Sequence, residues 1–175
     1  MSLIFQWIQQ LPSTYTQITS IVRPSIAVDP SGKYAYVANT DITYGCVFQY
    51  IIGTNGSLTP MSIPKVAAGS RPYSITVDPS GKYTYVTNIG DNTVSQYAIG
   101  TDGSLAPMST PTVATGSQPI HVTVDPSGKY AYVANYLGDT ISQYTIGTDG
   151  SLTPMSTPTV ATGYSPMGIA IAEPK

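Results

Sequence analysis

Short runs in which apolar and polar residues alternate fill most of the chain, and tight turns separate them. Four such runs follow one another in the stretch 116–162, at 120–124, 130–134, 140–146 and 158–162. Tyrosine occupies alternate positions in the second run, which is the two-residue period of a strand. The Asp149-Gly150 pair after the third run is typical of a hairpin turn. The pattern predicts four strands, named A to D in chain order, and their short connections favour an antiparallel meander over crossover helices.

The same four-strand pattern repeats along the chain. The motif Val-Asp-Pro-Ser-Gly-Lys-Tyr recurs with its aspartate at Asp29, Asp78 and Asp125, and residues 69–115 match residues 116–162 at 34 of 47 positions. A four-stranded sheet repeated about every 40–50 residues is typical of a β-propeller. We therefore predict one all-β propeller domain of about three and a half blades. Its units are a degenerate partial blade with strands C and D at 1–22, full blades at 23–68, 69–115 and 116–162, and a partial blade at 163–175 with a strand A at 165–172.

The last residues of each predicted strand B resemble a known repeat motif. The three segments read Tyr36-Val-Ala-Asn39, Tyr85-Val-Thr-Asn88 and Tyr132-Val-Ala-Asn135. They resemble the YVTN β-propeller repeats, a family that includes lactonase-like seven-bladed propellers and archaeal surface-layer proteins. The resemblance covers about residues 23–172 and implies a propeller fold. It does not fix the activity, because this fold hosts many unrelated functions.

Three and a half blades leave the predicted ring incomplete. Closed propellers contain about 4–8 blades, and an open arc would expose apolar blade faces and strand edges to water. We predict that a second chain completes the ring, as a homodimer of seven or eight blades. A compact monomeric ring of about four blades, an open or higher assembly, and a piece of a longer repeat array remain alternatives.

Composition removes several classes of function. Charged residues make up 9% of the chain, against about 25% in a typical soluble protein, and the net charge is −2 with only 7 Lys and Arg. No basic surface for nucleic acid is expected, and no apolar run is long enough for membrane insertion. The single cysteine, Cys46, excludes an internal disulfide and a multi-cysteine metal site. The first residues lack the pattern of a signal peptide, and only the family resemblance suggests an extracellular or cell-envelope location.

Few titratable residues are left for chemistry. Asp29, Asp78 and Asp125 begin A–B turns, Asp102 and Asp149 lie in hairpins, and Glu173 is in the tail. General acid–base catalysis needs positioned titratable groups, so this count disfavours an enzyme. We accordingly assign no catalytic residue, no metal site and no cofactor.

The remaining polar residues concentrate at one end of the predicted blades. In a meander the D–A and B–C connections share one end, and seven of the 13 differences between the two similar repeats fall there, in 71–74 and 89–92. Variable loops on a rigid scaffold are typical of binding sites. We predict a protein or small-molecule site at Arg71, Tyr73, Asn88, Asp91, Gln118, His121, Asn135 and Asp139.

Structural interpretations compete with this site. Loop capping is the favoured interpretation of Asn88 and Asn135, and a polar residue at the rim of the channel is the favoured interpretation of His121. The alternating tyrosines favour packing between blades over a sugar-stacking ladder.

Three functions follow from these observations. The first is a non-enzymatic interaction scaffold that uses the loops of the predicted site. The second, from the resemblance alone, is a lactonase-like hydrolase, for which His121, Arg71 and Asp91 or Asp139 are the available groups. The third is a structural repeat fragment of a surface or cell-envelope protein.

Overall fold

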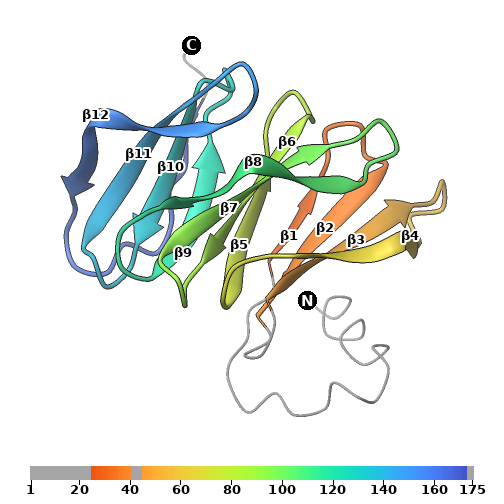
Figure 1. Cartoon of the computed structure of the whole chain (residues 1–175), viewed down its shortest axis with the longest axis horizontal. Helices are drawn as coiled ribbons and strands as arrows, with labels where there is room; N and C mark the ends of the chain where they lie inside the picture. The colour runs from red at the N-terminus through yellow and green to blue at the C-terminus, as the bar shows by residue number, and fades with distance from the viewer. Residues whose placement is uncertain (1–24, 41–44, 173–175) are drawn as a thin grey trace.

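The computed structural model describes residues 25–40 and 45–172, and their regular structure consists of twelve strands in three four-stranded antiparallel sheets (Figure 1). This confirms the predicted all-β blade architecture. The first sheet contains β1 (Ile26–Val28), β2 (Tyr34–Asn39), β3 (Cys46–Ile52) and β4 (Leu58–Ala67); the second contains β5 (Pro72–Val77), β6 (Tyr83–Asn88), β7 (Thr93–Ile99) and β8 (Leu105–Ala114); the third contains β9 (Pro119–Val124), β10 (Tyr130–Asn135), β11 (Thr140–Ile146) and β12 (Leu152–Ala161). Within each sheet the strands pair in chain order.

The recurring aspartate shapes the turn between the first two strands of each sheet. Asp29 accepts hydrogen bonds through Oδ1 from the backbone N–H groups of Lys33 and Tyr34, at 2.9 and 2.7 Å, and through Oδ2 from the N–H and hydroxyl groups of Ser31. Burial raises the pKa of the Asp29 carboxyl, but these hydrogen bonds outweigh it and hold the pKa below its ordinary value. The same bonds recur at Asp78 and Asp125, so the recurring Asp-Pro-Ser-Gly motif serves the turn.

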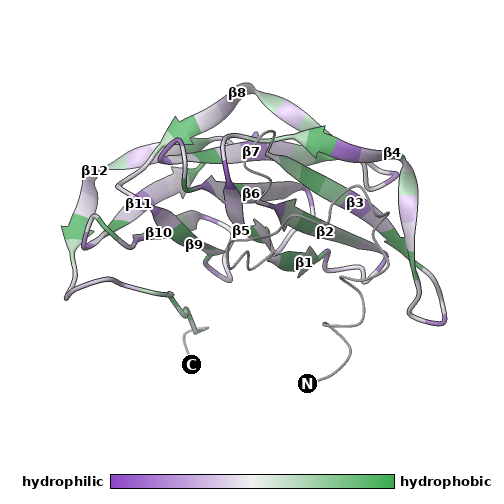
Figure 2. Cartoon of the chain, turned by 90° about the horizontal axis from the view of Figure 1, so that it is seen from below, coloured by the Kyte–Doolittle hydropathy of each residue, from purple (hydrophilic) through white to green (hydrophobic). Residues whose placement is uncertain are grey.

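The fourth strand is longer than its pattern predicts. The sequence predicts it at 158–162, whereas β12 begins at Leu152 and carries a register shift opposite Ser142 and Tyr144. The sequence does not predict the early part because Pro154 interrupts the strand pattern there. Proline is tolerated on an edge strand, where one side of the backbone needs no N–H donor. Figure 2 shows β4, β8 and β12 along the outer rim of the arch, with β1, β5 and β9 on its inner side.

Of the two partial blades predicted at 1–22 and 163–175, the structure describes only most of the second. Residues 163–172 follow β12 without forming a strand, so the strand predicted at 165–172 is absent from this structure. In each of the three described sheets the first strand pairs with the second, whereas no strand among the described residues pairs with residues 163–172. The predicted strands C and D at 1–22 lie outside the described residues. No helix in the described part of the chain is long and apolar enough to cross a membrane.

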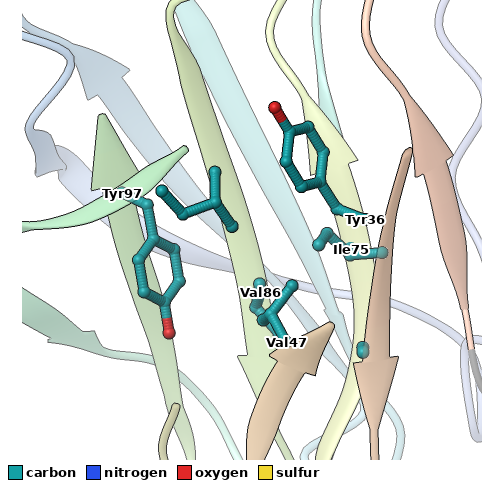
Figure 3. Close-up of a cluster of buried hydrophobic side chains, with 7 residues drawn as sticks. Tyr36, Val47, Ile75, Val86 and Tyr97 are labelled. Atoms are coloured by element: carbon teal, nitrogen blue, oxygen red, sulfur yellow. The ribbon is translucent and has the colours of Figure 1, made fainter. Parts of the chain in front are cut away.

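Each sheet packs face to face on the next one along the chain. We call the face that meets the following sheet the outgoing face and the face that meets the preceding sheet the incoming face. Figure 3 shows the contact between the first two sheets, where Tyr36 and Val47 lie with Ile75, Val86 and Tyr97 in one apolar cluster. An equivalent cluster joins the second and third sheets. The alternating tyrosines thus pack between blades, as the sequence favours.

Hydrogen bonds accompany this packing and repeat from one junction to the next. At the first junction the hydroxyl of Tyr36 donates to the carbonyl oxygen of Gly103 at 2.8 Å. The N–H of Leu105 donates to Oε1 of Gln49 at 2.6 Å.

The second junction repeats these bonds. The hydroxyl of Tyr85 donates to the carbonyl oxygen of Gly150 at 2.7 Å, and the N–H of Leu152 donates to Oε1 of Gln96 at 2.6 Å. Each junction also has a hydrogen bond from the later sheet to the earlier one. The hydroxyl of Tyr97 donates to the carbonyl oxygen of Ala67, and that of Tyr144 donates to the carbonyl oxygen of Ala114, both at 2.6 Å. Each junction therefore has the same polar contacts around its apolar cluster.

These contacts predict a difference between two tyrosines of β6. Replacing Tyr85 with Phe removes the donor to a buried Gly150 carbonyl and should lower the free energy of unfolding by about 1–2 kcal/mol. The control is Tyr83→Phe, because the Tyr83 hydroxyl donates to Thr148 at 3.2 Å in an exposed position and its loss should cost little. Urea denaturation measures both. Equal effects of the two substitutions would contradict the role given to the buried bond.

Candidate functional site

The D–A and B–C connections meet at one end of the sheets, as the meander predicts. At the second sheet, the N–H of Gly90 donates to the carbonyl of Ser70 at 3.0 Å and that of Ile89 to the carbonyl of Arg71 at 3.1 Å. At the third sheet, the N–H of Tyr136 donates to the carbonyl of Gln118 at 2.8 Å. We call the surface formed by residues 69–72, 89–92, 116–119 and 136–139 the loop face.

Several non-glycine residues of the loop face and its continuation have left-handed backbone conformations. Arg71, Gln118 and Ser165, each directly before a proline, have φ values of 55°, 52° and 52°. Such a conformation costs about 1–3 kcal/mol for a residue with a side chain and is frequent at functional sites. Side chains of the B–C connections stabilise these three D–A segments by accepting hydrogen bonds from their backbone N–H groups.

The two aspartates predicted to bind a ligand support the loop backbone. Oδ2 of Asp91 accepts a hydrogen bond from the N–H of Ser70 at 2.5 Å. Oδ1 of Asp139 accepts one from the N–H of Ser165 at 2.7 Å, and it holds that residue in its left-handed conformation. Each carboxylate therefore has one oxygen committed to the scaffold.

Asn92 is a residue of this surface that the predicted site omits. Its Oδ1 accepts a hydrogen bond from the N–H of Gln118 at 2.8 Å, which matches the bond from Ser165 to Asp139 one repeat later. The signal that could have found it is the repeat itself, because Asn92 occupies the position of Asp139. Both side chains tie a B–C connection to the next D–A connection.

Asn88 and Asn135 are fully buried, which favours the loop-capping interpretation over contact with a ligand. The amide Nδ2 of Asn88 donates to the hydroxyls of Thr93 and Ser95, at 3.0 and 2.9 Å. Asn135 makes the same two bonds to Thr140 and Ser142. These amides join the second strand of each sheet to the third, directly beneath the loop face.

His121 differs from the residues at the same position in the other repeats. The hydroxyl of Ser74 accepts a hydrogen bond from the N–H of Val122, and that of Ser25 accepts one from the N–H of Ile75, both at 3.3 Å. His121 replaces this serine in the third sheet, where it lies two residues after Pro119 and pairs with Ala134. Its Nδ1 is buried and has no hydrogen-bond partner. Burial lowers the pKa of the imidazole, so His121 is neutral at pH 7.

The remaining predicted residues lie on or beside the loop face. Arg71 is exposed, whereas Tyr73 and Gln118 are half-buried. Arg71 and Tyr73 belong to the second sheet and its D–A connection, and Gln118 to the connection that leads into the third. Within 25–40 and 45–172, no group of three or more His, Cys, Asp or Glu side chains could hold a metal ion. The loop face carries the exposed cation Arg71, and the neutral imidazole of His121 belongs to β9 of the third sheet.

The chain matches a known family and several solved structures. The family model of the lactonases, seven-bladed β-propellers, matches residues 9–113 and 47–168. No curated protein matches the chain. A candidate 6-phosphogluconolactonase from Bacteroides fragilis is 25% identical, with a TM-score of 0.73 over 83% of this chain and 40% of that one.

Two further structures are similar in fold. A candidate 6-phosphogluconolactonase from Bacteroides uniformis is 21% identical, with a TM-score of 0.71 over 85% of this chain and 45% of that one. A periplasmic gluconolactonase from Pseudomonas aeruginosa is 21% identical, with a TM-score of 0.70 over 79% of this chain and 42% of that one. The chain therefore spans less than half the length of these structures.

The buried asparagines lead to a test of the scaffold beneath the loop face. Oδ1 of Asn135 accepts a hydrogen bond from the hydroxyl of Thr115 at 2.9 Å, whereas the buried Oδ1 of Asn88 has no partner because Ala68 occupies the position of Thr115. Ala68→Thr should supply the missing donor and raise the free energy of unfolding by about 1 kcal/mol. Thr115→Ala, the reciprocal control, should lower it by a similar amount. A neutral or destabilising Ala68→Thr substitution, measured by urea denaturation, would contradict this explanation.

Proposed function

Because the chain belongs to the lactonase family of seven-bladed β-propellers, we propose that it forms part of a propeller that hydrolyses sugar-acid lactones at the loop face. The observation that carries the proposal is the neutral imidazole of His121, a half-buried side chain at the loop end of β9. Hydrolysis of a lactone requires a base of this kind to activate water.

The comparisons support a hydrolase better than the non-enzymatic scaffold that the count of titratable groups favours. The family model covers most of the chain, and the Bacteroides fragilis protein carries the name of a lactone hydrolase. A single suitable base is enough for ester hydrolysis, so the small number of acidic residues is a weak argument against catalysis. This chain spans 40% of that protein, and the activity is therefore proposed for the completed propeller.

In the proposed reaction, the neutral imidazole of His121 accepts a proton from a water molecule while the water oxygen forms a bond to the lactone carbonyl carbon. The tetrahedral intermediate then collapses and the bond between this carbon and the ring oxygen breaks. The departing ring oxygen takes the proton back from the imidazolium. The product is the open-chain hydroxy acid, and the imidazole is neutral again.

Arg71 would set the preference for the substrate. Its side chain is exposed on the loop face. Guanidinium groups bind carboxylate and phosphate groups through paired hydrogen bonds. We propose that Arg71 binds an anionic substituent of the lactone, such as a phosphate. Asp91 and Asp139 keep the connections in place and are not assigned to proton transfer.

The direct test is the hydrolysis of 6-phosphogluconolactone and gluconolactone, followed by pH-stat titration. His121→Ser is the chosen variant, because serine occupies this position in the other two sheets and suits the strand. The substitution should lower kcat/KM by about 100-fold or more, the usual contribution of a positioned base. Arg71→Gln should raise KM for the phosphorylated lactone and leave that for gluconolactone nearly unchanged.

The pH dependence of kcat/KM provides a further check. Since burial lowers the pKa of His121 from 6.5, the rate should be constant at neutral pH and should fall only below pH 6.5 as the imidazole is protonated. In His121→Ser this acid limb should disappear. Rates at background level in the native protein, or an unchanged rate in His121→Ser, would contradict the proposed function.

A further inference from the structure

The outgoing face of the third sheet has no sheet packed against it among the described residues. Tyr36 and Tyr85 are fully buried on the first two outgoing faces, whereas Tyr132 at the same position is only half-buried. The same holds for Gln143, whose counterparts Gln49 and Gln96 are each 1% exposed. Val160 and Tyr130 on this face are 40% and 39% exposed.

The incoming face of the first sheet is uncovered in the complementary way. Ile75 and Val122 are 5% and 2% exposed because the preceding sheet covers them, whereas Ile26 at the same position is 53% exposed. Glycine shows the same difference. A Cβ on Gly103 or Gly150 would clash with the ring of Tyr34 or Tyr83, but one on Gly56 would meet nothing within 4 Å.

These two faces have the same chemistry as the junctions inside the chain. The outgoing face of the third sheet carries Tyr132 and Gln143, whose counterparts in the first and second sheets donate and accept the hydrogen bonds of the internal junctions. The incoming face of the first sheet carries the matching glycine and leucine, Gly56 and Leu58. The outgoing face of the third sheet and the incoming face of the first sheet therefore carry the same groups as the pairs of faces that meet inside the chain.

We propose that the outgoing face of the third sheet docks on the incoming face of the first sheet of a second copy of this chain. In that junction the hydroxyl of Tyr132 donates to the carbonyl of Gly56, and the N–H of Leu58 donates to Oε1 of Gln143. Tyr130 packs on Gly56, as Tyr34 packs on Gly103. Ile26 becomes buried, as Ile75 and Val122 are at the internal junctions, and Val160 becomes partly buried, as Val66 and Val113 are.

The contact is head-to-tail, because two different faces meet. A head-to-tail contact closes into a ring when its rotation allows it. Two copies with three described sheets each would provide six blades, within the range of about 4–8 for closed propellers. The earlier count of seven or eight blades stays a prediction that depends on residues 1–22, which lie outside the described part.

Two charged substitutions and their mixture test the proposal. Ile26→Asp places a carboxylate on the incoming face, and Val160→Asp places one on the outgoing face. Both side chains are exposed in the single chain, so neither substitution should prevent folding, which circular dichroism checks. The control is Ile63→Asp, because Ile63 is 65% exposed on β4 and its counterpart Thr110 stays exposed in the second sheet, which is covered on both faces. Molar mass is measured by light scattering after size-exclusion chromatography at micromolar concentration.

The native chain and Ile63→Asp should have at least twice the 18.4 kDa mass of one chain. Ile26→Asp and Val160→Asp should each fall to 18.4 kDa. Their equimolar mixture should return to twice that mass, because the intact outgoing face of one variant meets the intact incoming face of the other. A native mass of one chain, association that survives both substitutions, or a mixture that remains monomeric would each overturn the proposal. Failure of lactone hydrolysis would leave these masses unchanged.

Discussion

Coverage of both faces of each four-stranded sheet is the constraint on which the rest of the structure depends. A single sheet of this size cannot bury its apolar side chains alone, and only the neighbouring sheets remove them from water. Ile75 and Val122 are almost completely buried because a preceding sheet covers them, while the equivalent Ile26 is half in solvent. The hydrogen bonds of Tyr36 and Tyr85 to the following sheet then fix the position in which the faces meet.

The sequence can vary more at the loop face than between the sheets, because the contacts between sheets are the same at each junction. Residues between the sheets, such as Gln49 and Gln96, make contacts that repeat at each junction. The loop face is free of that requirement, although Asp91, Asn92 and Asp139 still hold its backbone. The residue proposed as the base, His121, lies where the third repeat departs from the other two, which have Ser25 and Ser74 at this position.

Much of the fold could be predicted from the sequence because its repeats impose the same local pattern three times. The turn aspartates and the packing of tyrosines between blades follow from that pattern alone. The full length of β12 was not predictable in this way, because proline disfavours a strand except at an edge, and edge position is a property of the assembled sheet. The candidate site was predicted less well. The sequence does not show that Asn88 and Asn135 are buried, because the loops that cover them come from other parts of the chain. The burial of Nδ1 of His121 likewise depends on residues of neighbouring strands.

Amide hydrogen exchange of the leucines at the junctions tests most directly whether the sheets are held by their mutual faces. The N–H groups of Leu105 and Leu152 donate to Gln49 and Gln96 of the preceding sheet and are buried. They should exchange as slowly as the amides within the central strands, and Gln96→Leu should accelerate exchange at Leu152 while leaving Leu105 protected. Rapid exchange at both leucines in the native chain would contradict the account.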